Sequence, residues 1–531
     1  MKKAFVKKDS YFDSVSLMLM SRELKTTSGV ADAMVAMGTA MNIDLLKTMG
    51  FAASEFVDVT PNDLLIAIDA SNSEALEAAI DFASEALVRK KTPISGDGAK
   101  SEPTSTKLAV EQLAGANMAV ISLPGTYAVR EAHKALQLGL HVMLFSDNVS
   151  LDDEIALKTM GREKGLLVMG PDCGTAIING KPLCFANVVR RGPVGIVGAS
   201  GTGIQEVTCL VDRAQSGISQ AIGTGGRDLK NDKVGGTTML MAIEALAQDK
   251  GTKVIVVISK PPAKSMADKV ISALEQTGKP AVVFFIGLEP ETRDAKSKVH
   301  FATNLEQTAD MAIALTKNQP YTYKDFTLSD KDIKALIERE TKGMNANQKF
   351  IRGYYTGGTL ADEAWILLHK LTGAVFSNNQ TNCDFVPPDP HKSIGHTVVD
   401  LGDDIFTVGR PHPMIDPSTR TDRMLAEIDD QEIAVVLIDL VLGYGSHEDP
   451  AGALVPTIMA MREAACKRGG YLPVLASITG TQSDFQNFVN QKAKLESIGC
   501  VVLPSNYQAS MLAVKILEKV NIGIAERKGV R

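Results

Sequence analysis

Short apolar segments alternate with amphipathic segments along most of this 531-residue chain. Uninterrupted apolar runs are typical of strands in parallel sheets that are buried on both faces. The segments between them, such as 128–138 and 239–246, carry apolar residues three and four positions apart, which is typical of helices. The alternation predicts an α/β fold of several doubly wound, mainly parallel-sheet domains of Rossmann or flavodoxin type. The predicted strands include 63–69, 118–123, 141–145, 166–169, 194–197, 253–258, 281–286, 433–440, 472–478 and 500–503.

Polar breaks divide this pattern. Residues 91–107 are polar and contain two prolines and two glycines, 190–193 form a short turn before a strand, and 317–347 are polar and charged. Such segments are typical of linkers. At about 150 residues per domain, the length suggests three or four domains. We predict domains over residues 1–95, 108–190, 191–325 and 345–531.

Charge and cysteine usage exclude several classes of protein. The chain has 56 basic and 62 acidic residues, a net charge of −6, which argues against a broad nucleic-acid surface. No apolar run reaches the roughly 20 residues that cross a bilayer, and the charged start has no apolar core behind it. We therefore expect a cytoplasmic chain without a membrane or nucleic-acid partner. The six cysteines lack zinc-site spacing, so we predict reduced thiols and no metal site.

The strongest local motif is the turn after the strand 194–197. Glycine, serine and threonine fill the turn, and a helix is predicted to begin at Ser200, Gly201 and Thr202. The unpaired N–H groups of a helix's first turn, together with its dipole, bind anions. We therefore predict that these three residues bind phosphate. The spacing equally fits a plain strand-to-helix turn with a serine or threonine cap.

Further glycine-rich turns follow other predicted strands. Gly225, Gly226 and Arg227 form one, with an arginine that could pair bidentately with phosphate. Gly443 and Gly445 form another, predicted to lie at a helix start, and Gly480 has a similar place after strand 472–478. Ligands of open α/β sheets bind at the carboxyl ends of strands, so these turns are phosphate-site candidates. Plain connecting loops remain the alternative for each.

Four other positions are candidates for substrate contact or catalysis. Asp172 and Cys173 lie in a Gly-Pro-Asp-Cys-Gly turn after a strand, and a nucleophilic thiol competes there with a structural one. Arg410 and His412 lie in the segments 395–404 and 409–417, which we predict to be loops rich in His, Asp and Arg. Asp403, Asp404 and His412 could also be metal ligands, although their spacing indicates no particular metal.

Several of these motifs resemble those of a known family. Residues 118–315 resemble the α subunit of succinyl-CoA synthetase, through the turns at 170–173, 195–206 and 223–228. Residues 350–520 resemble the C-terminal domain of its β subunit, through 400–402, 439–440 and 479–481. Nearly the whole chain is identified as a member of the FdrA/YahF-type, acyl-CoA synthetase-like proteins, through the segments 11–18, 144–149, 170–175, 198–203, 225–229, 259–262 and 409–417. By this resemblance 108–190 is a CoA-binding-like Rossmann domain, and 191–325 and 345–531 are α-type and β-type ligase domains.

The resemblance also implies a site. In succinyl-CoA synthetases a phosphorylated histidine is held between two helix starts, one from each subunit type. Here the α-type helix would begin at Ser200, with Glu206 as the carboxylate that contacts the phosphohistidine, and the β-type helix would begin near Gly443 and Gly445. His300 is the nearest match to the histidine, although it lacks the flanking glycines of the family's turn. No ATP-grasp portion is recognisable, so ATP use by this chain alone is not expected.

The FdrA-type resemblance implies a reaction with phosphate. These proteins are associated with oxamate carbamoyltransferase in purine (allantoin) catabolism, which converts oxalurate and phosphate to oxamate and carbamoyl phosphate. Arg227, Arg410 and His412 would bind carboxylate or phosphate. Phosphate or an acyl phosphate is the expected ligand, CoA a further one, and other subunits of a multi-component, oligomeric enzyme the expected partners. Two alternatives remain: an acyl-CoA ligase that needs a nucleotide-binding partner, and a non-catalytic subunit that binds CoA or acyl phosphate.

Overall fold

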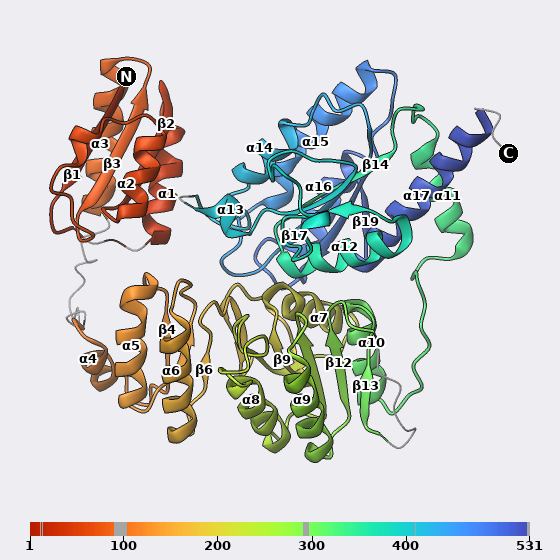
Figure 1. Ribbon diagram of the computed structural model, residues 1–531, viewed down its shortest axis with the longest axis horizontal. Coiled ribbons are helices and arrows are strands. Elements are labelled where there is room, and N and C mark those ends of the chain that lie inside the picture. Colours follow the sequence, from red (N-terminus) through yellow and green to blue (C-terminus); the bar gives the residue numbers. More distant parts are fainter. Residues whose placement is uncertain (11, 13, 90–102, 290–296, 409, 528–531) are drawn as a thin grey trace. The chain divides into compact units, whose positions relative to one another are not determined.

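The computed structural model describes residues 1–531 except 11, 13, 90–102, 290–296, 409 and 528–531 (Figure 1). It divides into two compact units. The first comprises Met1–Ala109 with Thr407–Pro411, and the second comprises Val110–Phe406 with His412–Arg531. The mobile linker predicted at 91–107 falls largely outside the described residues.

The first unit is built on a small antiparallel sheet with helices on both faces. The strands β1 (Lys2–Lys7), β2 (Val30–Met37) and β3 (Leu64–Ala70) lie in the order β1-β3-β2. One face packs against α1 (Ser14–Lys25) and α3 (Ser73–Arg89). The other packs against α2 (Ala40–Thr48) and the short helix η1 (Ala53–Phe56). The helix α4 (Thr106–Gln112) spans the boundary between the units.

The second unit begins with a small parallel sheet. Its strands β4 (Met118–Ile121), β5 (His141–Leu144) and β6 (Val168–Met169) alternate with α5 (Gly125–Gln137) and α6 (Leu151–Lys164). This is the alternation that the sequence predicted for this part of the chain.

A seven-stranded sheet follows, in the order β13-β12-β11-β9-β10-β7-β8. The five strands from β13 to β10 are parallel, whereas β7 pairs antiparallel with β10 and β8 pairs antiparallel with β7. These last two strands fall inside the predicted domain 108–190, so the sheet crosses the boundary we placed at residue 190. The strand bounds are β7 (Thr175–Ile178), β8 (Lys181–Cys184), β9 (Arg191–Ala199), β10 (Ile218–Gly223), β11 (Val254–Ser259), β12 (Ala281–Phe285) and β13 (Val299–Phe301).

The last sheet has six parallel strands in the order β15-β16-β14-β17-β18-β19. One of its strands, β16, occupies part of segment 395–404, which we predicted to be a loop; that prediction is wrong, because four consecutive residues of this strand, 397–400, are buried in the sheet. The bounds are β14 (Phe350–Tyr355), β15 (Val375–Phe376), β16 (His396–Asp400), β17 (Ile433–Val441), β18 (Val474–Thr479) and β19 (Val501–Leu503).

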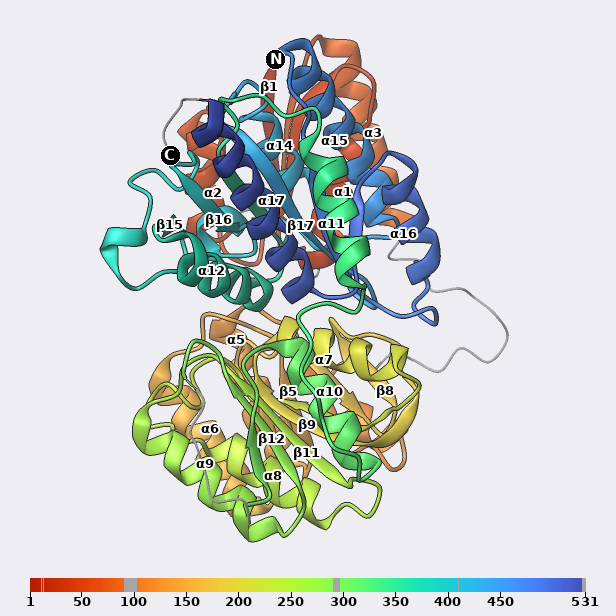
Figure 2. The same cartoon turned by 90° about the vertical axis from the view of Figure 1, so that its right-hand side faces the viewer.

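Four helices form a layer shared by the two large sheets. The helices α7 (Gly201–Arg213), α10 (Leu305–Thr316), α12 (Gly358–Thr372) and α17 (Asn506–Arg527) contribute to one hydrophobic core that also contains strand residues of both sheets (Figure 1, Figure 2). The outer face of the seven-stranded sheet packs on α8 (Thr237–Gln248) and α9 (Lys264–Thr277). That of the six-stranded sheet packs on α14 (Ser418–Leu425), α15 (Pro450–Lys467) and α16 (Phe488–Ser497).

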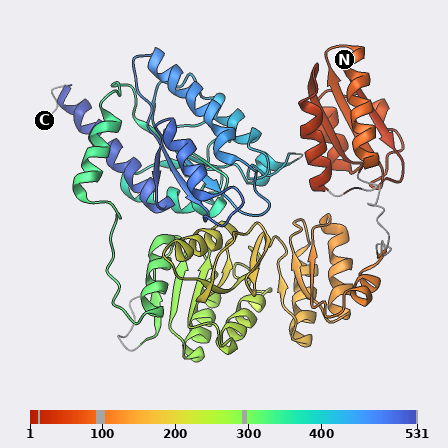
Figure 3. The same ribbon diagram turned by 180° about the vertical axis from the view of Figure 1, so that it is seen from behind.

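One long connection joins the half of the second unit that contains the seven-stranded sheet to the half that contains the six-stranded sheet. Residues 317–329 run without a helix or strand from α10 to α11 (Asp330–Thr341), and the green segment in Figure 3 follows this course. The segment matches the start of the polar linker predicted at 317–347. Three short elements, η2 (Cys383–Phe385), α13 (Asp404–Thr407) and β15, lie around β16. Within the described residues, no helix combines the length and apolar character needed to cross a membrane.

The fold class predicted from the sequence is confirmed: the chain is α/β, with several mainly parallel sheets.

The sheet topology also indicates where a ligand would bind. In each large sheet the chain first adds strands on one side of a central strand and then on the other, and the central strands are β9 and β14. Crevices at such switch points, at the carboxyl ends of the strands, are where open α/β sheets bind ligands.

Candidate functional site

The helices α7 and α12 begin at the two switch points, directly after β9 and β14. The prediction that a helix begins at Ser200 is confirmed, because Ser200 is the N-cap residue of α7. Among the described residues, none accepts a hydrogen bond from the N–H groups of Gly201, Thr202 or Gly203. The first turn of α7 therefore keeps the donors that an anion needs.

The starts of α7 and α12 touch each other. The Ser200 hydroxyl lies 2.7 Å from the Thr359 hydroxyl, and the Thr359 N–H donates to Thr202 Oγ1 at 3.3 Å. A Cβ on Gly357 would lie 3.0 Å from the Thr202 side chain, and one on Gly203 would lie 3.0 Å from the Thr359 side chain. Only glycines at these positions let the two turns approach so closely.

This contact corrects the position of the second helix start. The β-type helix predicted near Gly443 and Gly445 does not begin there: α15 begins at Pro450, capped by Asp449. The loop that contains both glycines instead packs against the other half, where the Tyr444 N–H donates to the carbonyl of Ala186 at 2.9 Å. The helix that faces α7 is α12, more than 80 residues earlier in the sequence.

The two helix starts differ in charge. Asp439 accepts hydrogen bonds from the N–H groups of Thr356 and Gly357 at 2.8 Å each, and it pairs with the buried Arg420 at 3.1 Å. Asp400 also lies at this helix start, because a Cβ on Gly358 would be 2.5 Å from its Oδ2. Carboxylates therefore occupy the start of α12, whereas only hydroxyl groups border that of α7. An added anion would find most of its donors on the α7 side.

Lys260 adds a positive charge beside these helix starts. It follows β11, the neighbour of β9, and its Nζ lies 2.9 Å from Asp362 in the first turns of α12. Burial alone would lower the pKa of Lys260, but Asp362 and other nearby carboxylates raise it above the ordinary value. Lys260 is therefore an ammonium at neutral pH, and Ser259 before it pairs in register with Ala199, the residue before the α7 cap Ser200.

Two carboxyl groups in this cluster titrate near neutrality. Desolvation raises the pKa of Asp172, whose side chain is exposed, to about 6, and the nearby charges of Asp147 and Asp404 add to the effect. Burial also raises the pKa of Asp400 to about 6, against hydrogen bonds from Asn379 and Gly402 that favour the carboxylate. The cluster thus combines a fixed cation with acids that can exchange protons near neutral pH. Asp172 was a predicted substrate contact, and it lies within this cluster.

The turn of Gly225, Gly226 and Arg227 is held by a buried ion network. Lys158 pairs with Asp228 at 2.6 Å and with Glu154 at 2.9 Å, and Glu154 in turn holds the Arg227 Nε at 2.7 Å. Gly225 has a φ of +83°, and a Cβ there would lie 2.3 Å from the carbonyl oxygen of Pro171. The Arg227 side chain remains 42% exposed, so it can still contact an anion despite these partners.

The other predicted residues lie in different surroundings. His412 is neutral at physiological pH, because burial lowers its pKa to about 4, and it packs beside Gly402 next to Asp400. Cys173 is 2% exposed, and burial raises its pKa to about 12, so it is an unreactive thiol out of reach of substrate. Arg410 belongs to the first unit, so the structure does not assign it to this cluster.

His300 and Glu206 lie away from the contact of the helix starts. His300 is a strand residue of β13 whose register across the sheet matches Val282, Val256 and Ile196. Ile196 precedes Ser200 by four residues, about 13 Å along the strand, and β13 is three strand spacings from β9. Glu206 is 1% exposed and accepts hydrogen bonds from Thr479 and from the N–H of Asn506, so it faces the junction between the halves.

The sequence reasoning missed four residues of this cluster: Lys260, Thr359, Asp400 and Asp439. A signal for Thr359 was present. The segment 201–206 reads Gly-Thr-x-x-x-Glu, and 358–363 repeats it at the start of α12. Both segments follow the central strand of a parallel sheet. The repeat therefore marks equivalent helix starts in the two halves.

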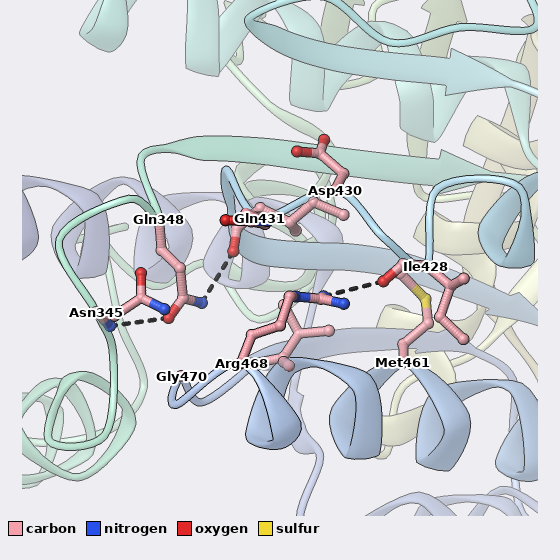
Figure 4. Close-up of a pocket in the computed structure, with 11 residues that line it drawn as sticks. Asn345, Gln348, Ile428, Asp430, Gln431, Met461, Arg468 and Gly470 are labelled. Carbon is pink, nitrogen blue, oxygen red and sulfur yellow. Dashed lines mark hydrogen bonds between the residues drawn. The ribbon is translucent and has the colours of Figure 1, made fainter.

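A recess elsewhere in the second unit is a poorer candidate. Figure 4 shows it beside Asn345, Gln348 and Arg468, near the amino end of β17. Its polar side chains are already paired, since Gln348 donates to the carbonyls of Ile433 and Tyr471 and Arg468 donates to the carbonyl of Ile428. Ligands of parallel sheets bind at the opposite, carboxyl ends of the strands.

Three family models match the chain. The "CoA binding domain" matches residues 189–287, and the "CoA-ligase" domain matches 354–516. We had placed the CoA-binding-like domain at 108–190, so the matching segment lies later in the chain. The "AllF, heavy metal-associated domain" matches 1–104. This segment contains neither cysteine nor histidine, so it lacks the thiolate and imidazole ligands that soft heavy metals prefer. The soft ligands that it does contain are methionine thioethers.

Relatives identified by sequence support the same assignment. The chain is 42% identical to YahF of Escherichia coli over 517 residues, which cover 97% of this chain and 99% of YahF. It is 27% identical over 190 residues to the succinate–CoA ligase [ADP-forming] subunit alpha 2 of Archaeoglobus fulgidus, covering 35% of this chain and 63% of that subunit. A solved acetyl-coenzyme A synthetase of Ca. Korarchaeum cryptofilum aligns with 77% of this chain and 85% of its own, at 16% identity and a TM-score of 0.32. The chain belongs to the YahF family of acyl-CoA synthetase-like proteins, within the succinyl-CoA synthetase superfamily.

Proposed function

We propose that this chain is the synthetase-like subunit of an enzyme that transfers an acyl or carbamoyl group to or from phosphate, and that the phosphate group binds where α7 and α12 begin. The observation that carries the proposal is the first turn of α7. The N–H groups of Gly201, Thr202 and Gly203 have no acceptor among the described residues, and Lys260 supplies an ammonium beside them. Backbone donors and a cation together suit a dianion such as phosphate.

The conversion of oxalurate and phosphate to oxamate and carbamoyl phosphate is a concrete instance. The carbamoyl carbon loses its bond to the inner nitrogen and gains a bond to a phosphate oxygen. The proton of the hydrogen phosphate is transferred to the nitrogen, so atoms and charge balance. The carboxyl groups of Asp172 and Asp400, with pKa values of about 6, could relay that proton.

A succinate–CoA-ligase-type acyl-CoA synthetase is the second candidate, and one observation favours it. Two of the matching family models concern CoA, and together they cover much of the second unit. This candidate requires a nucleotide-binding partner and places CoA, rather than phosphate alone, among the ligands. A non-catalytic subunit that binds CoA or acyl phosphate would show ligand binding without turnover in the presence of its partners.

A thermal-shift panel with phosphate, carbamoyl phosphate, CoA and ATP–Mg tests the proposal. A ligand at 100 times its dissociation constant stabilises the folded chain by about 2.7 kcal/mol. We expect a shift with phosphate or carbamoyl phosphate. Loss of the charge-assisted hydrogen bond in Lys260→Met should weaken binding roughly 10- to 100-fold. The control is Lys253→Met, which removes an exposed lysine just before the other end of the same strand. A shift in melting temperature with CoA alone would favour the ligase. If phosphate raised the melting temperature of neither Lys260→Met nor the control Lys253→Met, the phosphate site would be contradicted.

A further inference from the structure

The two helices of the proposed phosphate site carry matching glutamates. Glu206 is the sixth residue of α7, and Glu363 is the sixth residue of α12. Both are almost completely buried, at 1% and 5% exposed. Neither points to the contact of the helix starts, so a role in binding phosphate directly does not explain them.

Each glutamate instead holds the start of a helix in the opposite half. Glu363 Oε1 accepts the N–H of Leu305, the first residue of α10, at 2.7 Å. Glu206 Oε1 accepts the N–H of Asn506, the first residue of α17, at 3.4 Å. The helices α7 and α10 belong to the seven-stranded half, and α12 and α17 to the six-stranded half. The two contacts are therefore reciprocal, and a carboxylate at a helix start is favourable.

The side chain of Asn506 links the two contacts. Its Nδ2 donates to Glu363 Oε2 at 2.8 Å and to the carbonyl of Leu360 at 2.9 Å, both on α12. Its Oδ1 is buried and has no donor within the described part of the chain. A proton on a neighbouring carboxyl group would supply that donor. Thr479, at the end of β18, adds a hydrogen bond to Glu206 from the six-stranded half.

We propose that Glu206 and Glu363 are paired positioning residues that set the spacing between the first turns of α7 and α12 and so the affinity of the site for a phosphate-like anion. This inference rests on the proposed function. Each residue fixes its own helix against the other half a turn or two from the anion donors. A change in either contact shifts one helix start relative to the other, without removing any group that touches the anion.

The junction also contains other charged groups, which must be separated from the pair. Burial, with the nearby charges of Glu206 and Glu306, raises the pKa of Glu363 to about 7. Glu306 has a similar pKa of about 7 for the same main reason, but it lies on α10 and bonds to Ser505 and Gln508. Arg213 on α7 and Asp439 on β17 also act on Glu206, Cys209 of α7 lies near Glu206, and Tyr355 of β14 lies near Glu363, whereas Asp310 on α10 acts on Glu306. Glu306→Gln is therefore the matched control: a buried glutamate of the same junction that lies on neither phosphate-site helix.

The test is calorimetric titration with phosphate and with sulfate, whose charge does not change between pH 6 and 8. We expect Glu206→Gln and Glu363→Gln to weaken both anions by about 2- to 30-fold, the range typical of residues that act without touching the ligand. Glu306→Gln should leave the affinity unchanged. If either glutamine variant fails to fold, Thr479→Val removes a single hydrogen bond from Glu206 and should weaken binding in the same direction.

The pH dependence of sulfate affinity distinguishes a positioning role of the two glutamates from a role in stability alone. Ionisation of Glu363, whose pKa is about 7, adds a negative charge beside Glu206 in one buried junction, so sulfate affinity of the unaltered chain should fall as the pH rises through about 7. This step should be much smaller in Glu363→Gln than in Glu306→Gln, while the contribution of Asp172 and Asp400 near pH 6 is common to all variants.

Two failures are distinguishable. Equal affinities and equal pH profiles in all variants would overturn the positioning role and leave the phosphate site intact. No binding of either anion to the unaltered chain would overturn the phosphate site, and the positioning role with it.

Discussion

The pKa of Glu363 predicts how the stability of the second unit changes with pH. Its folded-state pKa is about 7, whereas an unperturbed glutamate has a pKa near 4.5. A difference of about 2.5 units corresponds to roughly 3 kcal/mol. Because the folded-state pKa is raised, this contribution to stability is fully present below pH 4.5 and is lost as the pH rises through about 7. Glu363→Gln removes the ionisation and with it the loss.

The assay is urea denaturation followed by the fluorescence of Trp365, the only tryptophan of the chain. Trp365 lies on α12 two residues after Glu363, and its Nε1 donates to the carbonyl of Val375 at 2.8 Å. Other carboxyl groups titrate in the same range, so the informative quantity is the stability difference between Glu363→Gln and the unaltered chain. We expect this difference to change by about 3 kcal/mol in favour of the variant between pH 4 and pH 8. A difference that stays constant with pH would show that folding does not shift the pKa of Glu363 and would refute the reasoning.

Two further predictions concern glycines and thiols. Gly358→Ala should destabilise the second unit by about 1–3 kcal/mol and abolish phosphate binding, because its Cβ would lie 2.5 Å from a carboxyl oxygen of Asp400. The control is Gly174→Ala, whose Cβ would have no neighbour nearer than 3.8 Å. Equal urea midpoints and equal phosphate affinities of the two variants would contradict the prediction. In a thiol titration of the folded chain, the exposed Cys383 and Cys466 should react fast and the buried cysteines only after denaturation; fast reaction of a buried thiol would contradict the burial.

The alternation of strands and helices was predictable because it depends on local pattern. The apolar segment 194–197 corresponds to β9, and the turn at Ser200 corresponds to the start of α7. Each is dictated by burial of an apolar strand and by the capping preferences of a few adjacent residues. These signals do not depend on the rest of the chain.

The second helix start was not predicted, because its strand does not look apolar. β14 reads Phe-Ile-Arg-Gly-Tyr-Tyr, yet Arg352 is only 2% exposed. Its charge is neutralised by Asp430 at 2.7 Å, a partner 78 residues away. Since β14 was overlooked, α12 was overlooked with it, and the helix start was assigned to the glycines at 443 and 445.

The charged residues of the cluster were not predictable from local sequence either, because their partners are distant in the sequence. Lys260 meets Asp362 only because the ends of two different sheets face each other. Glu206 was predicted to be catalytic from its place in a family motif. Its hydrogen-bond partners Thr479 and Asn506 lie about 300 residues later, and they hold its carboxylate at the junction between the two halves. Long-range pairing decides such roles, and one sequence does not contain it.

A crystal structure of the chain soaked with phosphate tests the central claim most directly. The account predicts one phosphate at the contact of α7 and α12, accepting hydrogen bonds from the N–H groups of Gly201, Thr202 and Gly203 and lying within reach of Lys260. Density for phosphate only at other places, with these helix starts still in direct contact, would contradict it.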